Sequence, residues 1–173
     1  MCSSDLLEFD FEEPSSSKQI YDERQRTIAR RFVDQPDAMQ IAAGAIRIQN
    51  DLPDATIPEA IAYYFLETRD VIFYYQSSHL GGRSVLGGLV PDFVVASGGG
   101  HGYVWLIQGE YWHGQHAVVE HDLRALQDLN DVTISGVEIL DVVEIWENDI
   151  YMFYPQVFDL AMDGIGMRNS RIS

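Results

Sequence analysis

Two neighbouring apolar runs carry the side chains of this sequence that could perform chemistry. Asp92 lies inside the first run, 89–96, and the second run, 103–108, ends in the polar stretch QGEYWH, 108–113. An ionised carboxylate is costly to bury in an apolar strand, so Asp92 needs a metal ion, a helix terminus or hydrogen-bond donors beside it. The pattern places one acidic residue next to a polar strand end. An aspartate satisfied by backbone donors is the alternative to a metal ligand.

These residues resemble the PD-(D/E)XK nuclease superfamily, and within it the very-short-patch-repair endonucleases and related phage-encoded proteins. Pro91-Asp92 is similar to the proline and aspartate that the superfamily carries on one core strand, and Trp112-His113 is similar to the ending of the very-short-patch branch. The resemblance covers roughly residues 58 to 147, about half of the chain. It implies a restriction-endonuclease-like core.

The resemblance also implies roles for single residues. The implied catalytic positions are Glu59, Asp92, Gln108 and His113, and the implied metal ligands are Asp92, Glu59 and Glu110. Leu106 stands at the usual acidic position and Gln108 at the usual lysine position, so a metal would lose a ligand and the reacting centre would lose a charge. His113 is the best candidate for a general acid or base. An active enzyme of this class would use magnesium, whereas a degenerate one would need no cofactor.

Some of these residues also have a purely local explanation. Thr56 and Glu59 have the spacing of a capping box at the start of a helix, which accounts for the glutamate without a metal. His113, His116 and Glu120 would share one helix face if a helix begins at the histidines, which is the ligand set of a two-histidine, one-carboxylate metal site. Histidines at a helix start and carboxylates facing solvent are the commoner explanation of that spacing.

The charge distribution argues against a polyanionic partner for the core. The chain has 27 acids against 11 bases, a formal net charge of −16. From residue 48 to 167 there are only three arginines against eighteen acids, and one basic group precedes this region: Lys18, Arg24, Arg26, Arg30 and Arg31. Binding to nucleic acid depends largely on neutralising phosphates, so the core would repel a duplex. The basic group could touch phosphate, or it could form a solvated face that pairs with the chain's own acids.

The elements that must position the candidate residues form an α/β pattern. We expect helices at 19–33, 37–49, 57–68, 116–130 and 155–161, and strands at 71–77, 89–96, 103–108 and 137–146. The order of helix, three strands, helix and strand predicts a central mixed sheet flanked by helices, with an N-terminal helical extension. The expected division is a flexible acidic tail at 1–17, a helical extension at 18–50, a nuclease-like α/β core at 51–166 and a C-terminal tail at 167–173.

Composition limits the number of domains, the possible disulfide and zinc sites, and the relation of the chain to membranes. A chain of 173 residues with 46% hydrophobic residues suits one folded domain. The single cysteine, Cys2, excludes an internal disulfide framework and a cysteine-based zinc site. The sequence contains no apolar run of membrane-spanning length, and its start is acidic rather than signal-like. We therefore expect a soluble protein without a membrane partner, either cytoplasmic or assembled into a phage virion.

Two functions of different class fit these observations. The favoured one is a catalytically degenerate nuclease-fold protein with a structural or assembly role, in a phage particle, whose partners are other protein subunits. It is favoured because the acid and the lysine are both absent and the core is acidic. The other is a metal-dependent DNA endonuclease that uses Asp92, Glu59 and His113. DNA is a partner only under this second function.

The N-terminal tail generates a first prediction. Residues 1–17 hold five acids and no base, together with four apolar residues that could dock on a partner protein: Leu6, Leu7, Phe9 and Phe11. We expect this end to lack regular structure in the isolated chain, so limited proteolysis should trim it first. Mass spectrometry of the earliest fragments checks the order of cleavage. A protease-resistant N-terminus in a verified monomer would contradict the docking idea.

Overall fold

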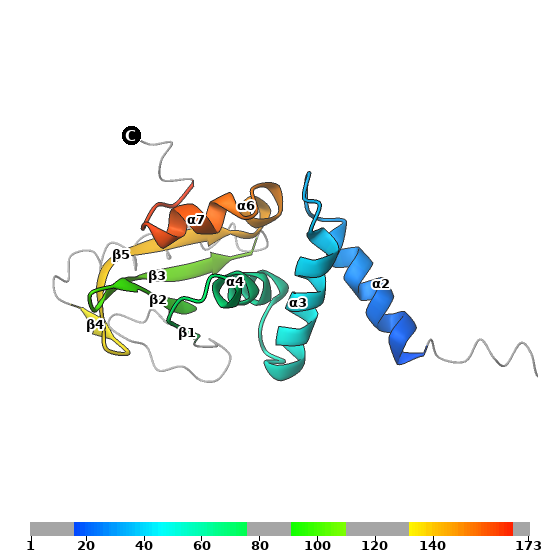
Figure 1. Cartoon of the computed structure of the whole chain (residues 1–173), viewed down its shortest axis with the longest axis horizontal. Coiled ribbons are helices and arrows are strands. Elements are labelled where there is room, and N and C mark those ends of the chain that lie inside the picture. Colours follow the sequence, from blue (N-terminus) through cyan, green and yellow to red (C-terminus); the bar gives the residue numbers. More distant parts are fainter. Residues whose placement is uncertain (1–15, 76–90, 110–131, 168–173) are drawn as a thin grey trace, which may run out of the picture.

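The computed structural model describes residues 16–75, 91–109 and 132–167. In these ranges the chain forms a five-stranded mixed sheet with helices packed against it, and two further helices extend to one side (Figure 1). An α/β fold with a central mixed sheet, flanking helices and an N-terminal helical part is therefore confirmed.

The sheet has the strand order β1-β2-β3-β5-β4. Its strands are β1 (Phe73–Tyr75), β2 (Phe93–Gly98), β3 (His101–Gln108), β4 (Thr133–Ile134) and β5 (Val137–Trp146). The strands β1, β2 and β3 form an antiparallel meander, β5 runs parallel to β3, and β4 pairs antiparallel with β5. A parallel pair needs a crossover connection. The helix expected at 116–130 for this connection lies outside the described residues.

Three helices cover one face of the sheet: α4 (Ile57–Thr68), α6 (Glu147–Met152) and α7 (Gln156–Met162). Figure 1 shows α4 and α7 against the central strands. The centre of this layer is Trp105, which stacks on Phe158 with ring centroids 5.6 Å apart and donates its indole N–H to the carbonyl of Ala161 at 3.1 Å. None of the helices in the described ranges is long and apolar enough to cross a membrane.

The opposite face of the sheet is apolar as well. Side chains alternate between faces along a strand, so Phe93 and Val95 face the helices while Val94 lies on the second face. The buried cluster on this second face contains Val94, Val104, Leu106, Val132, Ile134, Val137 and Val142. Burial on both faces explains why β2 and β3 read as almost continuous apolar runs.

A tight hairpin joins β2 to β3. Gly98, Gly99 and Gly100 have φ angles of 111°, 64° and 80°, which L-residues with side chains rarely adopt. Two residues further on, Gly102 pairs with Ala96, and the register shifts on either side of this pair. A Cβ at Gly102 would lie 2.2 Å from the carbonyl oxygen of Val95. Glycine at this position is therefore required by the close approach of the two strands.

The N-terminal helices are α2 (Ser17–Ala29) and α3 (Ala38–Asp51). Ser16 caps α2 in a capping box with Gln19. The helix α2 packs on α3, and α3 packs on α4, so α2 lies farthest from the sheet (Figure 1). The only buried residue within α2 is Ile28, which leaves most of its surface exposed.

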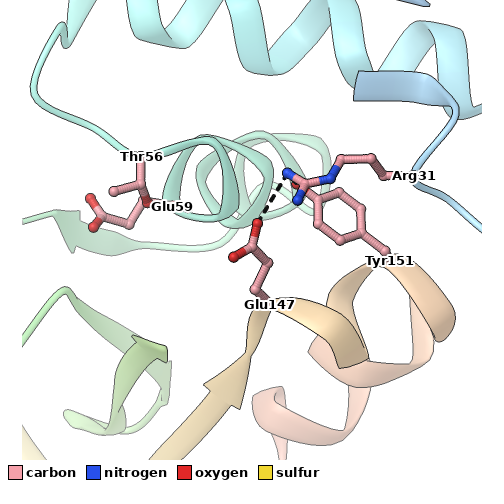
Figure 2. Close-up of polar contacts among 5 residues, drawn as sticks. All are labelled: Arg31, Thr56, Glu59, Glu147 and Tyr151. Atoms are coloured by element: carbon pink, nitrogen blue, oxygen red, sulfur yellow. Dashed lines mark hydrogen bonds and ion pairs between the residues drawn. The ribbon is translucent and has the colours of Figure 1, made fainter. Parts of the chain in front are cut away.

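Residues 31–33, which follow α2, connect the N-terminal helices to α6. Figure 2 shows Arg31 above Tyr151 and Glu147: its guanidinium donates to the Glu147 carboxylate and to the Tyr151 hydroxyl, both at 3.2 Å. The backbone N–H of Val33 donates to the carbonyl of Tyr151 at 3.0 Å, and the ring of buried Phe32 meets the ring of Tyr151 edge-on. Burial raises the pKa of Tyr151 to about 12, so its hydroxyl is neutral near pH 7. The exposed ion pair contributes about 1 kcal/mol or less to stability. The buried Phe32 ring and the backbone hydrogen bond of Val33 therefore stabilise most of this contact with α6.

Several predicted boundaries differ from the structure. Asp92 was expected inside a strand, but it lies one residue before β2, because Pro91 has no N–H to donate to a ladder. The structure ends α2 at Ala29 rather than at Val33, and it starts β1 at Phe73 rather than at Val71. The short elements β4 and α6 were not expected, whereas the bounds of β5 were predicted correctly.

The contact at Gly102 provides a test of the sheet. Gly102→Ala should lower the free energy of unfolding by about 2 kcal/mol or more, because the strands must separate to admit the methyl group. Gly136→Ala is the matched control: Gly136 has open space around its Cβ position and a φ of 78°, so the same substitution adds only backbone strain, about 1 kcal/mol. Urea denaturation compares the two. Equal decreases in the free energy of unfolding of the two variants would show that the sheet tolerates a Cβ at Gly102.

Candidate functional site

Asp92 is fixed by a hydrogen bond to the neighbouring strand. Its Oδ2 accepts the backbone N–H of Ile107 in β3 at 2.8 Å. Phe93 pairs with Trp105, so one further step of the same register places Asp92 beside Leu106. The carboxylate therefore satisfies a backbone donor of β3 where the ladder of β2 begins. Asp92 and Gln108 thus lie at the same end of two adjacent strands, as the sequence predicted.

Glu59 approaches the site from the first turn of α4. Its side chain is buried, with 6% exposure, and its Oε2 accepts the hydroxyl of Tyr75 in β1 at 2.5 Å. Thr56 caps the helix by accepting the backbone N–H of Glu59 at 3.3 Å; Figure 2 shows both residues at the start of α4. Only this half of the expected capping box forms. The glutamate side chain reaches β1 instead, so helix capping does not account for its carboxylate.

The two carboxylates are close enough to repel each other. The pKa of Asp92 is raised from an ordinary aspartate value to about 7, first by burial and then by the charge of Glu59, while the N–H of Ile107 acts in the opposite direction. Near neutral pH, Asp92 is therefore protonated about half of the time. A pair of this kind has two uses: it can share a proton, or it can receive a cation that relieves the repulsion.

The neighbouring strand offers little to complete the site. Leu106 is 4% exposed and belongs to the apolar cluster on the second face of the sheet. Gln108 ends β3, is partly buried and pairs with Trp146 of β5. The structure thus brings Glu59 and Asp92 together and places Leu106 and Gln108 on the adjoining strand. Glu110, His113, His116 and Glu120 lie outside the described residues.

Sequence reasoning missed two polar residues of this region. Tyr75 was expected in a strand without a role, yet its hydroxyl holds Glu59; no sequence signal links residues sixteen positions apart in this way. Glu144 was given no role in the site, but it is partly buried and pairs with Leu106 of the adjoining strand β3. The alternation of apolar residues along β5 could have placed Glu144 on the same face as Val142.

The ability of the site to hold magnesium depends on its oxygen ligands. Glu59 and Asp92 provide carboxylates, which Mg²⁺ prefers, and Mg²⁺ commonly binds one or two carboxylates and keeps several waters. One oxygen of each is already engaged, by Tyr75 and by Ile107. Across residues 16–75, 91–109 and 132–167, no group of three or more His, Cys, Asp or Glu side chains could hold a metal ion. These two carboxylates fit a water-rich Mg²⁺ site, with half of their oxygens engaged elsewhere.

Comparisons with known proteins identify no relative of this chain. No family model matches the chain, and neither a curated protein nor a solved structure matches it.

The raised pKa of Asp92 predicts how stability depends on pH. Because the folded-state pKa of about 7 exceeds the ordinary value, the folded protein holds a proton that the unfolded chain has already released. The contribution of Asp92 to stability is complete below about pH 4 and is lost as the pH rises through about 7. With about 1.4 kcal/mol for each pKa unit, the loss is on the order of a few kcal/mol.

Asp92→Asn should remove this loss while keeping an oxygen that accepts the N–H of Ile107. The free energy of unfolding of the variant minus that of the wild type should therefore be larger at about pH 8 than at about pH 5. Urea denaturation at both pH values measures this difference. Asp54→Asn is the control, because Asp54 is exposed and should show little change. The same stability difference at both pH values would mean that Asp92 does not titrate in this range.

Proposed function

We propose that this chain is a nuclease-fold protein without nuclease activity, which acts through contacts with other protein subunits in an assembly. One observation carries the proposal: the residue beside Asp92 on β3 is Leu106, buried among valines. The resemblance expects a second acidic ligand at this position. Without it, a metal at Asp92 lacks one of the hard oxygen ligands that would fix its geometry.

The end of β3 supports the same conclusion. Gln108 stands where the resemblance expects lysine, and its amide is neutral. An amide can donate a hydrogen bond, but it provides no positive charge to stabilise the charge that develops on a phosphate during cleavage. The metal ligand and the cation are therefore both missing from β3.

The electrostatics of the core oppose DNA binding. Between residues 51 and 167, the described part of the chain carries thirteen Asp and Glu residues and one Lys or Arg residue, Arg69. Arg69 forms an ion pair with Asp159 at 3.0 Å. Among the described residues of the core, a phosphate backbone approaching Asp92 would therefore meet acids without an unpaired Lys or Arg to supply the counter-charge on which nucleic-acid affinity depends.

The assembly role rests on the resemblance and on the tail. The likeness to phage-encoded proteins suggests a virion as the assembly, and the apolar residues between Leu6 and Phe11 are suited to docking on another subunit. A fold by itself does not fix a function. The absence of a complete catalytic set separates this proposal from an active nuclease.

A metal-dependent endonuclease is the second candidate, and one observation favours it. Glu59 and Asp92 come from separate elements and meet at a partly buried point where the pKa of Asp92 is raised to about 7. Perturbed carboxylates of this kind are concentrated at functional sites. An active enzyme would need Mg²⁺ at these two residues, with Glu110 and His113 supplied by the part of the chain outside the described ranges.

DNA cleavage distinguishes the two candidates. The purified protein should not cleave duplex, mismatched or branched DNA with Mg²⁺ or Mn²⁺ at physiological salt, because the site lacks a ligand and a cation and the core repels the substrate. Gel analysis of end-labelled DNA over a range of protein concentrations gives the measurement. A known nuclease in the same buffers is the positive control.

Asp92→Ala and His113→Ala identify the origin of any cleavage. Cleavage by the wild type that disappears in both variants would overturn the proposal and establish the endonuclease. Cleavage that is equal in all three preparations indicates a contaminating nuclease and leaves the wild-type chain inactive. Co-sedimentation of an inactive protein with assembled particles would support the structural role.

A further inference from the structure

The buried carboxylate of Glu59 is stabilised by a neutral donor. Its Oε2 accepts the hydroxyl of Tyr75 in β1 at 2.5 Å, and only 6% of Glu59 is exposed. Within the described ranges, neither Glu59 nor Asp92 takes part in an ion pair. A buried carboxylate is costly to keep without a partner. The Tyr75 hydroxyl therefore stabilises Glu59 where a cation could otherwise do so.

The ring of Tyr75 is held independently of its hydroxyl. Tyr75 pairs with Phe93 across β1 and β2, and their ring centroids are 5.0 Å apart. The ring of Tyr75 also meets that of Tyr63 in α4 edge-on, with the centroids 5.9 Å apart. A phenylalanine in place of Tyr75 would keep both ring contacts. The substitution would thus remove the hydroxyl with little change to the aromatic core.

The two hydrogen bonds hold the carboxylates towards different strands. Glu59 is bonded to β1 through Tyr75, while Asp92 is bonded to β3 through the N–H of Ile107. In the sheet, β1 and β3 lie on opposite sides of β2. A Mg²⁺ ion shared by the pair would have to draw the carboxylates together, since it binds its oxygen ligands at about 2 Å. Sharing a cation therefore competes with at least one of these bonds.

The bond from Tyr75 is the one that can yield. The N–H of Ile107 belongs to the backbone of β3, which pairs with β2 on one side and with β5 on the other. The Tyr75 hydroxyl stands at the end of a side chain, on a three-residue strand at the edge of the described sheet. A hydrogen bond to a carboxylate is strong because the acceptor is charged, so a cation that neutralises Glu59 weakens it.

We propose that Tyr75 is a positioning residue that lowers the affinity of Glu59 and Asp92 for divalent cations, because its hydroxyl holds Glu59 to β1. The proposal rests on the non-catalytic function proposed above and adds a separate cause to it. At Leu106 and Gln108, β3 lacks an acid and a cation. The Tyr75 hydroxyl, by contrast, engages a carboxylate that the chain still has.

The opposite role is also known for hydrogen bonds of this kind. A donor can support a metal by orienting the carboxylate that binds it, and losing such a donor typically weakens metal binding about 10- to 100-fold. The two roles predict opposite changes in affinity when the hydroxyl of Tyr75 is removed. The sign of the change therefore decides between them.

Tyr75→Phe tests the proposal. The variant should bind Mn²⁺ about tenfold more tightly than the wild type, because it has no hydrogen bond to a charged group to give up. Electron paramagnetic resonance of unbound Mn²⁺ gives the dissociation constants, in one buffer at about pH 8, where most of Asp92 is ionised. Displacement of Mn²⁺ by Mg²⁺ checks that both ions use the same site. Mn²⁺ should also raise the melting temperature of the variant more than that of the wild type.

Three further variants serve as controls. Tyr74→Phe removes a hydroxyl from the opposite face of the same strand, where Tyr74 is 41% exposed, and should leave Mn²⁺ affinity unchanged. Tyr75→Leu also lacks the hydroxyl and should show the same gain as Tyr75→Phe. Adding Glu59→Gln to Tyr75→Phe should remove the gain, because the metal then loses a carboxylate ligand. Thermal denaturation without metal checks that each variant is folded.

Each outcome decides the proposal. Weaker binding by Tyr75→Phe would make the hydroxyl a support for the metal and would overturn it. Unchanged affinity, or a gain that persists in Tyr75→Phe/Glu59→Gln, would overturn it as well, because the hydroxyl would then not act through Glu59. DNA cleavage is scored separately on the same preparations. An inactive wild type leaves the non-catalytic function standing whatever the metal affinities, and an active one overturns that function even if Tyr75→Phe gains affinity.

Discussion

Two carboxylates, those of Glu59 and Asp92, are held near each other against their mutual repulsion, and the surrounding elements make this possible. The first turn of α4 delivers Glu59, β1 supplies the hydroxyl of Tyr75, and β3 supplies the N–H of Ile107. Each carboxylate is stabilised by a donor from a different strand of the meander. The arrangement therefore depends on the order of β1, β2 and β3, and a change in strand register would separate the donors from the acids.

Much of the framework could be predicted from sequence because local patterns determine it. The alternation and β-branched residues of 137–146 defined β5, and Thr56 with Pro58 defined the start of α4. The short elements could not be predicted in this way, because two residues of β4 and six of α6 are too few to show a period. The start of β2 was placed too early because the apolar pattern of 89–96 was weighted above Pro91, whose missing N–H is itself a sequence signal against a ladder at that point.

The candidate site, too, could be predicted only where residue types or local patterns determine it. Leu106 and Gln108 stand in the sequence itself, so the missing acid and the missing lysine follow from residue types alone. The bond from Tyr75 to Glu59 and the pairing of Leu106 with Glu144 depend on how helix and strands are brought together, which no local pattern encodes. Thr56 and Glu59 show the limit of local reasoning. The Thr56 side chain accepts the backbone N–H of Glu59, as the capping spacing predicts, but the Glu59 carboxylate contacts β1, which is distant in sequence.

The separation of charges along the described molecule gives it a permanent electric dipole moment. Within the described residues, the cations that form no ion pair lie on α2 and at its C-cap, Arg30, at one end, and the acids of the sheet and its covering helices lie towards the other (Figure 1). A molecule of this kind turns in the field of a charged neighbour before it touches it, which raises the rate of productive encounters.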